Sequence, residues 1–242
     1  MILYRNQIET VPFIEWIFAQ GTIFQFWTPD CLRKYGCGTP NGALWTIGVM
    51  VQCYFVLWIF HKLMKKRKLW VWIISLCIGI VVNILLPLSY MHLPILLYKL
   101  LYQTFIPYFW IFILGAMISE FFELWIELFK KYWFLFLIMT AIVSFTKFDE
   151  GVYGTLKVLF LAPAVIGFAY RFSKLNIKLD FSYGFYIYHM VVINVMIELG
   201  FTKKIIDMVV AWALSIIFGI FSYYTFGFFS RIQRKKLVTG TK

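Results

Sequence analysis

The sequence predicts an all-α integral membrane protein: a bundle of about seven transmembrane helices with an additional N-terminal helix in the membrane interface. Of its 242 residues, 62% are hydrophobic and only 14% are charged, whereas charged residues supply about a quarter of a soluble globular chain. The mean hydropathy is +0.80. The net charge of +12 is spread in short clusters between apolar runs, which is typical of membrane helices and not of a nucleic-acid surface. Disordered, disulfide-stabilised and ordinary cytosolic proteins are therefore excluded.

Each predicted span is an apolar run of a length that suits a membrane crossing, for which a helix needs about 20 residues. The seven runs cover residues 42–60, 69–86, 104–119, 132–145, 153–170, 181–199 and 206–229. Helices are favoured over strands because the runs are long and contain Ala, Leu and Met freely.

The loops between the runs predict the orientation, because positively charged loops stay on the cytoplasmic face. Most Lys and Arg residues follow the first, third, fifth and seventh runs. We therefore expect this side and the C-terminus to be cytoplasmic. On the same side, charges alternate with aromatic residues over residues 120–131, which favours a separate interfacial helix.

Residues 8–27 form an apolar segment that Glu9, Pro12 and Glu15 interrupt. A charged residue at the bilayer centre costs about 2.5 kcal/mol or more on insertion scales, so we favour a helix in the outer interface, anchored by Trp16 and Trp27. A true span with its acids buried against other helices is the alternative. No linker or repeat divides the chain, so a single membrane domain over residues 1–242 is expected.

Cysteine and histidine spacing indicates no zinc or redox site. Cys31 and Cys37 fall in one outer loop. Two alternatives remain for this pair: a disulfide across the loop, or two free thiols. His61 and His92 are expected at the membrane interfaces, whereas His189 lies inside the sixth run.

His189 shares one helix face with Ser182 and Tyr186, at steps of three and four residues. Polar groups on a membrane helix face other helices or a water-filled cavity. Two interpretations stay open: a histidine hydrogen-bonded between packed helices, or a cavity-lining group that binds substrate or moves a proton near neutral pH.

The stretch NGALWT, from Asn41 to Thr46, lies at the outer start of the first run. Its residues suit a turn into a helix, because Asn41 can cap a helix and Trp45 can anchor at the interface. If a site exists here, we expect Trp45, Tyr186 and His189 to converge on one cavity.

Two stretches taken together resemble the acyltransferase 3 family of integral-membrane O-acyltransferases. The first runs from residue 25 through NGALWTI to Gln52 and Tyr54, and is similar to the family's Asn-Gly-Ser-Leu-Trp-Thr signature. The second is DFSYGFYIYH, from Asp180 to His189, similar to the family's Ser-Tyr-Gly-x-Tyr-x-x-His stretch. Either stretch alone would be a weak signal; the pair, in this order, is more specific.

The resemblance implies an enzyme of the bacterial inner (plasma) membrane that takes an acyl group from acyl-CoA, commonly acetyl-CoA. The acceptor would be a hydroxyl of an envelope glycan, a lipid-linked sugar or another extracytoplasmic molecule, as in O-acetylation during polysaccharide modification. Membrane lipid would surround the protein, with no metal, bound cofactor or nucleic acid. The residues implied in substrate binding are Asn41, Trp45, Thr46, Gln52, Ser182, Tyr183, Tyr186 and His189.

The sequence also departs from the family pattern. Family members begin with a helix that carries an Arg and then the His taken as essential for catalysis, and this chain is similar only to the later two-thirds of the family domain. Met50 stands where an acidic residue usually follows the signature, and a thioether cannot take that residue's proton. No catalytic residue of the family is therefore intact, which leaves His189 as the candidate base.

These departures lead to two expectations about function. The chain is either an N-terminally truncated acyltransferase, inactive alone or dependent on the missing N-terminal segment as a partner, or a non-catalytic membrane remnant, scaffold or carrier.

Overall fold

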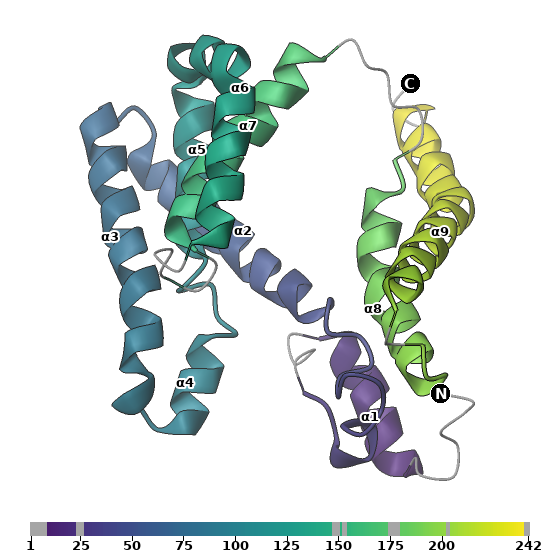
Figure 1. The fold of residues 1–242 in the computed structure, drawn as a ribbon. Helices are drawn as coiled ribbons and strands as arrows, with labels where there is room; N and C mark the ends of the chain where they lie inside the picture. Colours follow the sequence, from purple (N-terminus) through teal and green to yellow (C-terminus); the bar gives the residue numbers. More distant parts are fainter. Residues whose placement is uncertain are drawn as a thin grey trace. The chain divides into compact units, whose positions relative to one another are not determined.

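The computed structural model describes residues 9–22, 27–146, 151, 154–173, 180–201 and 204–239, and within these ranges every regular element is a helix (Figure 1). The helices are α1 (Thr10–Gln20), α2 (Trp45–Met64), α3 (Leu69–Leu88), α4 (Ile95–Leu101), α5 (Phe109–Glu120), α6 (Phe122–Phe145), α7 (Thr155–Arg171), α8 (Ser182–Glu198) and α9 (Ile205–Thr239). Two single 3₁₀ turns, η2 (Asp30–Leu32) and η3 (Ser89–Met91), lie in the connections. The all-α class predicted from the sequence is confirmed.

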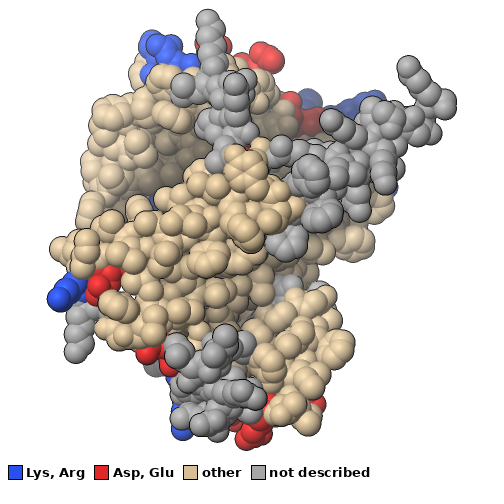
Figure 2. All heavy atoms as spheres, turned by 90° about the vertical axis from the view of Figure 1, so that its right-hand side faces the viewer, with Lys and Arg blue, Asp and Glu red and all other residues tan. Residues whose placement is uncertain are grey.

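Four of the described helices are long and apolar enough to cross a membrane: α2, α3, α6 and the Ile205–Thr225 part of α9. α5 is apolar but has only 12 residues, about 18 Å at 1.5 Å per residue. On the face drawn in Figure 2, most of the described surface belongs to residues other than Lys, Arg, Asp and Glu. An integral membrane protein is thus indicated, with four long apolar helices, and the count of seven crossings stays a prediction.

The expected interfacial helix over residues 120–131 is wrong as a separate element. α6 begins at Phe122 and continues for 24 residues to Phe145, so this charged segment and the fourth predicted span are one helix. Its charges are compatible with a helix because they stand three and four residues apart, and Lys130 Nζ lies 2.7 Å from Glu127 Oε1. The helix break falls instead at Phe121, between α5 and α6.

The N-terminal helix is shorter than the predicted segment. α1 ends at Gln20, before Gly21, and none of its side chains is buried; Phe18 is 74% exposed. Residue 8 and residues 23–26 of the predicted segment lie outside the described residues. The placement of α1 in the interface stays a prediction.

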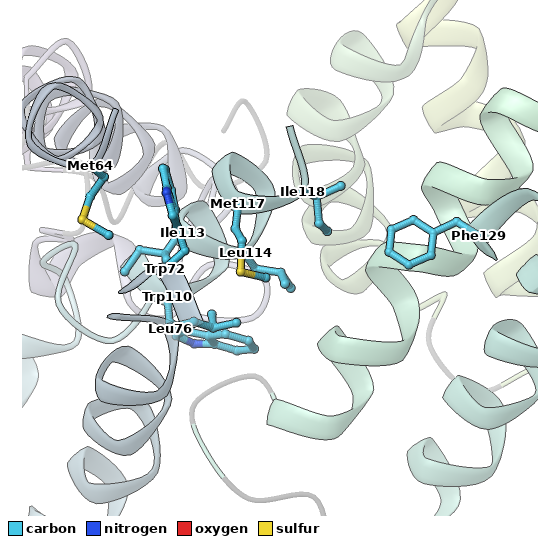
Figure 3. Close-up of a cluster of buried hydrophobic side chains, with 9 residues drawn as sticks. All are labelled: Met64, Trp72, Leu76, Trp110, Ile113, Leu114, Met117, Ile118 and Phe129. Carbon is cyan, nitrogen blue, oxygen red and sulfur yellow. The ribbon is translucent and has the colours of Figure 1, made fainter. Parts of the chain in front are cut away.

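The chain divides into two compact units, one made of residues 1–48 and 177–242 and the other of Val49–Asn176. The second unit contains a core of aromatic and aliphatic side chains from α2, α3, α5 and α6 (Figure 3). Trp72 and Trp110 are its largest fully buried members. α5 packs closely on α3, since a Cβ at Gly79 would lie 2.7 Å from Trp110 Cβ.

In the same unit α6 and α7 pack side by side (Figure 1). Gly167 of α7 lies so close to α6 that a Cβ there would be 2.2 Å from the carbonyl oxygen of Phe129.

The first unit is built around α8 and α9, which also pack along each other (Figure 1). Here two glycines meet: a Cβ at Gly184 would lie 2.9 Å from Gly219 Cα. Gly184 is the glycine of the predicted Ser-Tyr-Gly motif, so close helix packing alone gives a reason for it.

Candidate functional site

Residues 36–46, here called the signature segment, are fastened to α8 by the side chain of Asn194. Asn194 Oδ1 accepts a hydrogen bond from Cys37 N at 2.8 Å, while Nδ2 donates to the carbonyl oxygens of Thr39 at 2.8 Å and Pro40 at 2.9 Å. The side chain is completely buried. Because a buried amide that lacked such partners would be destabilising, the segment and α8 fix each other.

One turn further along α8, Glu198 holds the start of the signature segment. Its Oε1 accepts a hydrogen bond from Gly36 N at 2.8 Å. Gly36 has φ +56°, and a Cβ at this position would lie 2.1 Å from Asn194 Oδ1, so both the backbone conformation and the contact require glycine. Burial, and then the nearby Glu198 carboxylate, raise the pKa of Tyr35.

The other end of the segment is bonded to the beginning of α8. Asn41 accepts a hydrogen bond from Ala43 N and donates one to the carbonyl oxygen of Ile187, both at 3.2 Å. The Tyr186 hydroxyl donates to the carbonyl oxygen of Ala43 at 3.1 Å and is hydrogen-bonded to the Thr46 hydroxyl. The two motifs predicted from the sequence are therefore in direct contact, through Thr46 and Tyr186.

Asn194 and Glu198 are the contact residues that the sequence analysis missed. With Tyr186 they stand at spacings of eight and four residues, which places all three on one face of α8. Polar residues repeating at helical spacing in an apolar run are the signal that could have found them.

His189 lies to the side of that face and is half-buried. Its Nδ1 is 2.5 Å from the carbonyl oxygen of Tyr186. A carbonyl oxygen only accepts hydrogen bonds, so Nδ1 carries the proton and, in the neutral ring, Nε2 carries the lone pair. No described residue forms a hydrogen bond to Nε2. The ring also lies beside those of Phe185 and Tyr186, with centroids 6.2 and 5.7 Å away.

Ser182 is not turned toward this group. It is exposed, and its hydroxyl donates to Asp180 Oδ1 at 2.6 Å, while its backbone N–H donates to the same oxygen at 3.2 Å. These two bonds lower the pKa of Asp180. The pair therefore serves the first turn of α8, whose N–H groups have no partners within the helix.

A cavity of about 520 Å³ lies between the signature segment, the first half of α8 and α9. Tyr183 is the one predicted site residue among its lining residues, which also include Leu44 and Tyr188. Trp45, Tyr186 and His189 do not line it. The expected convergence of Trp45, Tyr186 and His189 is therefore not seen at this cavity.

Gln52 and Met50 belong to the part of α2 in the second unit. The Gln52 amide donates to the carbonyl oxygen of Gln103 at 3.3 Å and accepts from Phe105 N at 3.2 Å. The described contacts of Gln52 are thus with the loop between α4 and α5.

The remaining candidate chemistry is limited. Cys31 and Cys37 are both free thiols, and no group of three or more His, Cys, Asp or Glu side chains that could hold a metal ion occurs among the described residues.

Comparison with known protein families matches one family model, described as an acyltransferase domain, to residues 8–230. Neither a curated protein nor a solved structure matches the chain.

Proposed function

The chain belongs to the acyltransferase 3 family, and from this premise we propose that it transfers an acyl group from acyl-CoA to a hydroxyl of an extracytoplasmic acceptor. Acetyl-CoA is the donor expected, and an envelope glycan or a lipid-linked sugar the acceptor. The observation that carries the proposal is that the two family motifs meet, at Thr46 and Tyr186, with His189 one turn further along α8.

In the proposed step, His189 acts as the base. Its Nδ1–H is held by the Tyr186 carbonyl, which leaves Nε2 to take the proton of the acceptor hydroxyl. The acceptor oxygen then attacks the thioester carbonyl, and the carbon–sulfur bond breaks. The CoA thiolate leaves with the proton that His189 had taken, so the histidine returns to its starting form.

The proposal places the reaction in a bacterial inner membrane that the chain crosses seven times, with its C-terminus in the cytoplasm. α5, α7 and α8 would complete the crossings made by the four long apolar helices. The basic residues after the first, third, fifth and seventh predicted spans support this orientation.

The test is acetyl transfer by the purified full chain from radiolabelled acetyl-CoA to an O-deacetylated envelope glycan. We expect His189→Gln to lower the rate by about a hundredfold or more, the usual contribution of a general base, while His92→Gln, at an exposed position, leaves it unchanged. Equal thermal stability of the variants would show that the loss is catalytic. A wild-type rate unaffected by His189→Gln would contradict the assignment of the base.

A second candidate, a non-catalytic scaffold or carrier, is favoured by one observation. The side chains of Asn41, Thr46 and Gln52, predicted to bind substrate, all form hydrogen bonds within the protein. In this case the chain binds the glycan but forms no product, and His189→Gln changes neither result.

A further inference from the structure

A separate cavity lies within the second unit, where α2 and α5 end. Its volume is about 630 Å³, within the range of small-molecule sites. The lining residues are Tyr54, Leu57, Trp58, His61, Lys62 and Lys65 from α2 and the turn after it, with Ala116, Ser119 and Glu120 from α5. We call this cavity the α2–α5 pocket.

The sequence builds this pocket by helical spacing. On α2 the lining positions recur every three or four residues, and on α5 Ala116, Ser119 and Glu120 do the same, so each helix presents one face to the pocket. Along α2 that face changes from aromatic to basic side chains. One end of the pocket is thus suited to a flat organic group and the other to an anion.

The charges in the pocket leave an excess of cations. Its one carboxylate, Glu120, is paired with His61, with Oε2 and Nε2 3.4 Å apart. Lys62 Nζ lies 3.5 Å from the centroid of the Trp58 ring, and this cation–π contact holds the ammonium group over the indole. Neither Lys62 nor Lys65 forms an ion pair with a carboxylate of the described residues.

The chain after α2 forms a basic turn that begins with Lys65, which lines the pocket. Lys65 N donates to the carbonyl oxygen of His61 at 2.8 Å, and Arg67 N donates to that of Met64 at 2.9 Å. Lys66 between them has φ +66°, a left-handed conformation that ends the helix in a tight turn. The basic run therefore turns back at the end of α2.

We propose that the α2–α5 pocket binds a phosphate-bearing ligand, with Lys62 and Lys65 on the phosphate oxygens and Tyr54 and Trp58 against an attached flat group. Tyr54 and Trp58 are 61% and 58% exposed, so their rings are accessible. The ligand we assign is the nucleotide end of acyl-CoA, which carries phosphates and an adenine ring; this assignment rests on the proposed function. The headgroup of an anionic phospholipid offers the same phosphate chemistry.

The experiment measures CoA binding by calorimetry to the purified full chain in phosphatidylcholine nanodiscs. The double variant Lys62→Ala with Lys65→Ala is compared with Lys99→Ala with Lys131→Ala, which removes the same charge at exposed positions outside the pocket. We expect the Kd for CoA to rise about tenfold or more in the pocket variant, because charge-assisted hydrogen bonds are lost, and less than about twofold in the control. Pantethine, which lacks phosphates, should not bind measurably.

The outcomes distinguish failure of the α2–α5 pocket assignment from failure of the proposed acyltransferase function. Equal CoA affinity in the pocket variant and the control overturns the site, while His189-dependent acetyl transfer would leave the proposed function standing. If CoA fails to bind but phosphatidylglycerol raises the Tm of the wild type and not of the pocket variant, the phosphate site holds with lipid as its ligand. The acyl-CoA donor of the proposed function would then be wrong. Binding of neither ligand overturns the proposal.

Discussion

At the scale of single residues, the signature segment depends on one amide and one glycine. The sequence predicted Thr46 and Tyr186 as substrate-binding residues, because both fall in recognisable motifs, but it did not predict that their hydroxyl groups meet. Asn194 was missed because helical spacing shows that a face of α8 is polar but does not name its partners, which are backbone groups more than 150 positions away.

The glycine gives a direct test of this attachment. Gly36→Ala places a Cβ 2.1 Å from Asn194 Oδ1 at φ +56°, whereas Gly200→Ala, at φ +81°, meets nothing within 4 Å. We expect each substitution to lower the free energy of unfolding by about 1–2 kcal/mol through the backbone, and Gly36→Ala to cost about 1–3 kcal/mol more through overpacking. Unfolding in a denaturing detergent measures the free energy of unfolding of each variant. Equal decreases for Gly36→Ala and Gly200→Ala would contradict the close contact between Gly36 and Asn194.

The hydrogen bonds from Ser182 to the Asp180 carboxylate give a prediction about pH. The pKa of the Asp180 carboxyl is lower in the folded state than its ordinary value of 3.8. The ionised carboxylate therefore stabilises the fold at any pH above 3.8, and this stabilisation is lost as the pH falls through the folded-state pKa. We expect Asp180→Ala to have a lower Tm than the wild type at pH 7, with the gap closing below pH 3.8. Ser182→Ala removes the hydroxyl donor that lowers the pKa of Asp180 most, so in that background the Tm difference should disappear at a higher pH. A Tm difference that is constant with pH would contradict a stabilising role for these hydrogen bonds.

At the scale of helices, the hydropathy pattern predicted the elements best where charges or turns bound an apolar run. The runs 69–86 and 181–199 correspond to α3 (Leu69–Leu88) and α8 (Ser182–Glu198). The division near residue 131 failed because charges at helical spacing do not end a helix. α4 was not predicted, since seven residues are too few to show a period.

Close packing of α6 on α7 makes a prediction at this scale. Gly167→Ala brings a Cβ to 2.2 Å from the Phe129 carbonyl oxygen, whereas Gly115→Ala, also within a helix, meets no atom within 4 Å. We expect Gly167→Ala to destabilise the second unit by about 1–3 kcal/mol and Gly115→Ala to be neutral or slightly stabilising, since alanine favours helices. Thermal unfolding in detergent compares them; the same Tm for both would mean that the helices are not in close contact.

At the scale of the whole molecule, composition predicted a membrane protein, and the length and residue content of the apolar runs predicted helices, whose backbone polar groups are paired within each span. Composition does not determine the number of crossings. α7 and α8, at 17 residues each, measure about 26 Å, slightly less than the hydrocarbon thickness of about 30 Å.

Orientation is testable with cysteines. A chain retaining only Cys37, which is exposed, should react with a membrane-impermeant maleimide in intact spheroplasts. A cysteine-free chain with Lys68→Cys, exposed between α2 and α3, should react only after the membrane is permeabilised. A chain retaining only Cys53, which is buried, is the control for non-specific labelling. The reverse pattern would place the C-terminus outside the cytoplasm.

The attachment of the signature segment to α8 has a consequence for biogenesis. Cys37 leaves the ribosome 157 residues before Asn194, an interval of about 8–30 s at 5–20 residues per second. Throughout that interval the backbone groups of Cys37, Thr39 and Pro40 lack the Asn194 side chain that pairs with them in the folded protein. A nascent chain stalled before α8 would therefore expose an unsatisfied polar loop, which quality-control proteases could recognise as an unfinished product.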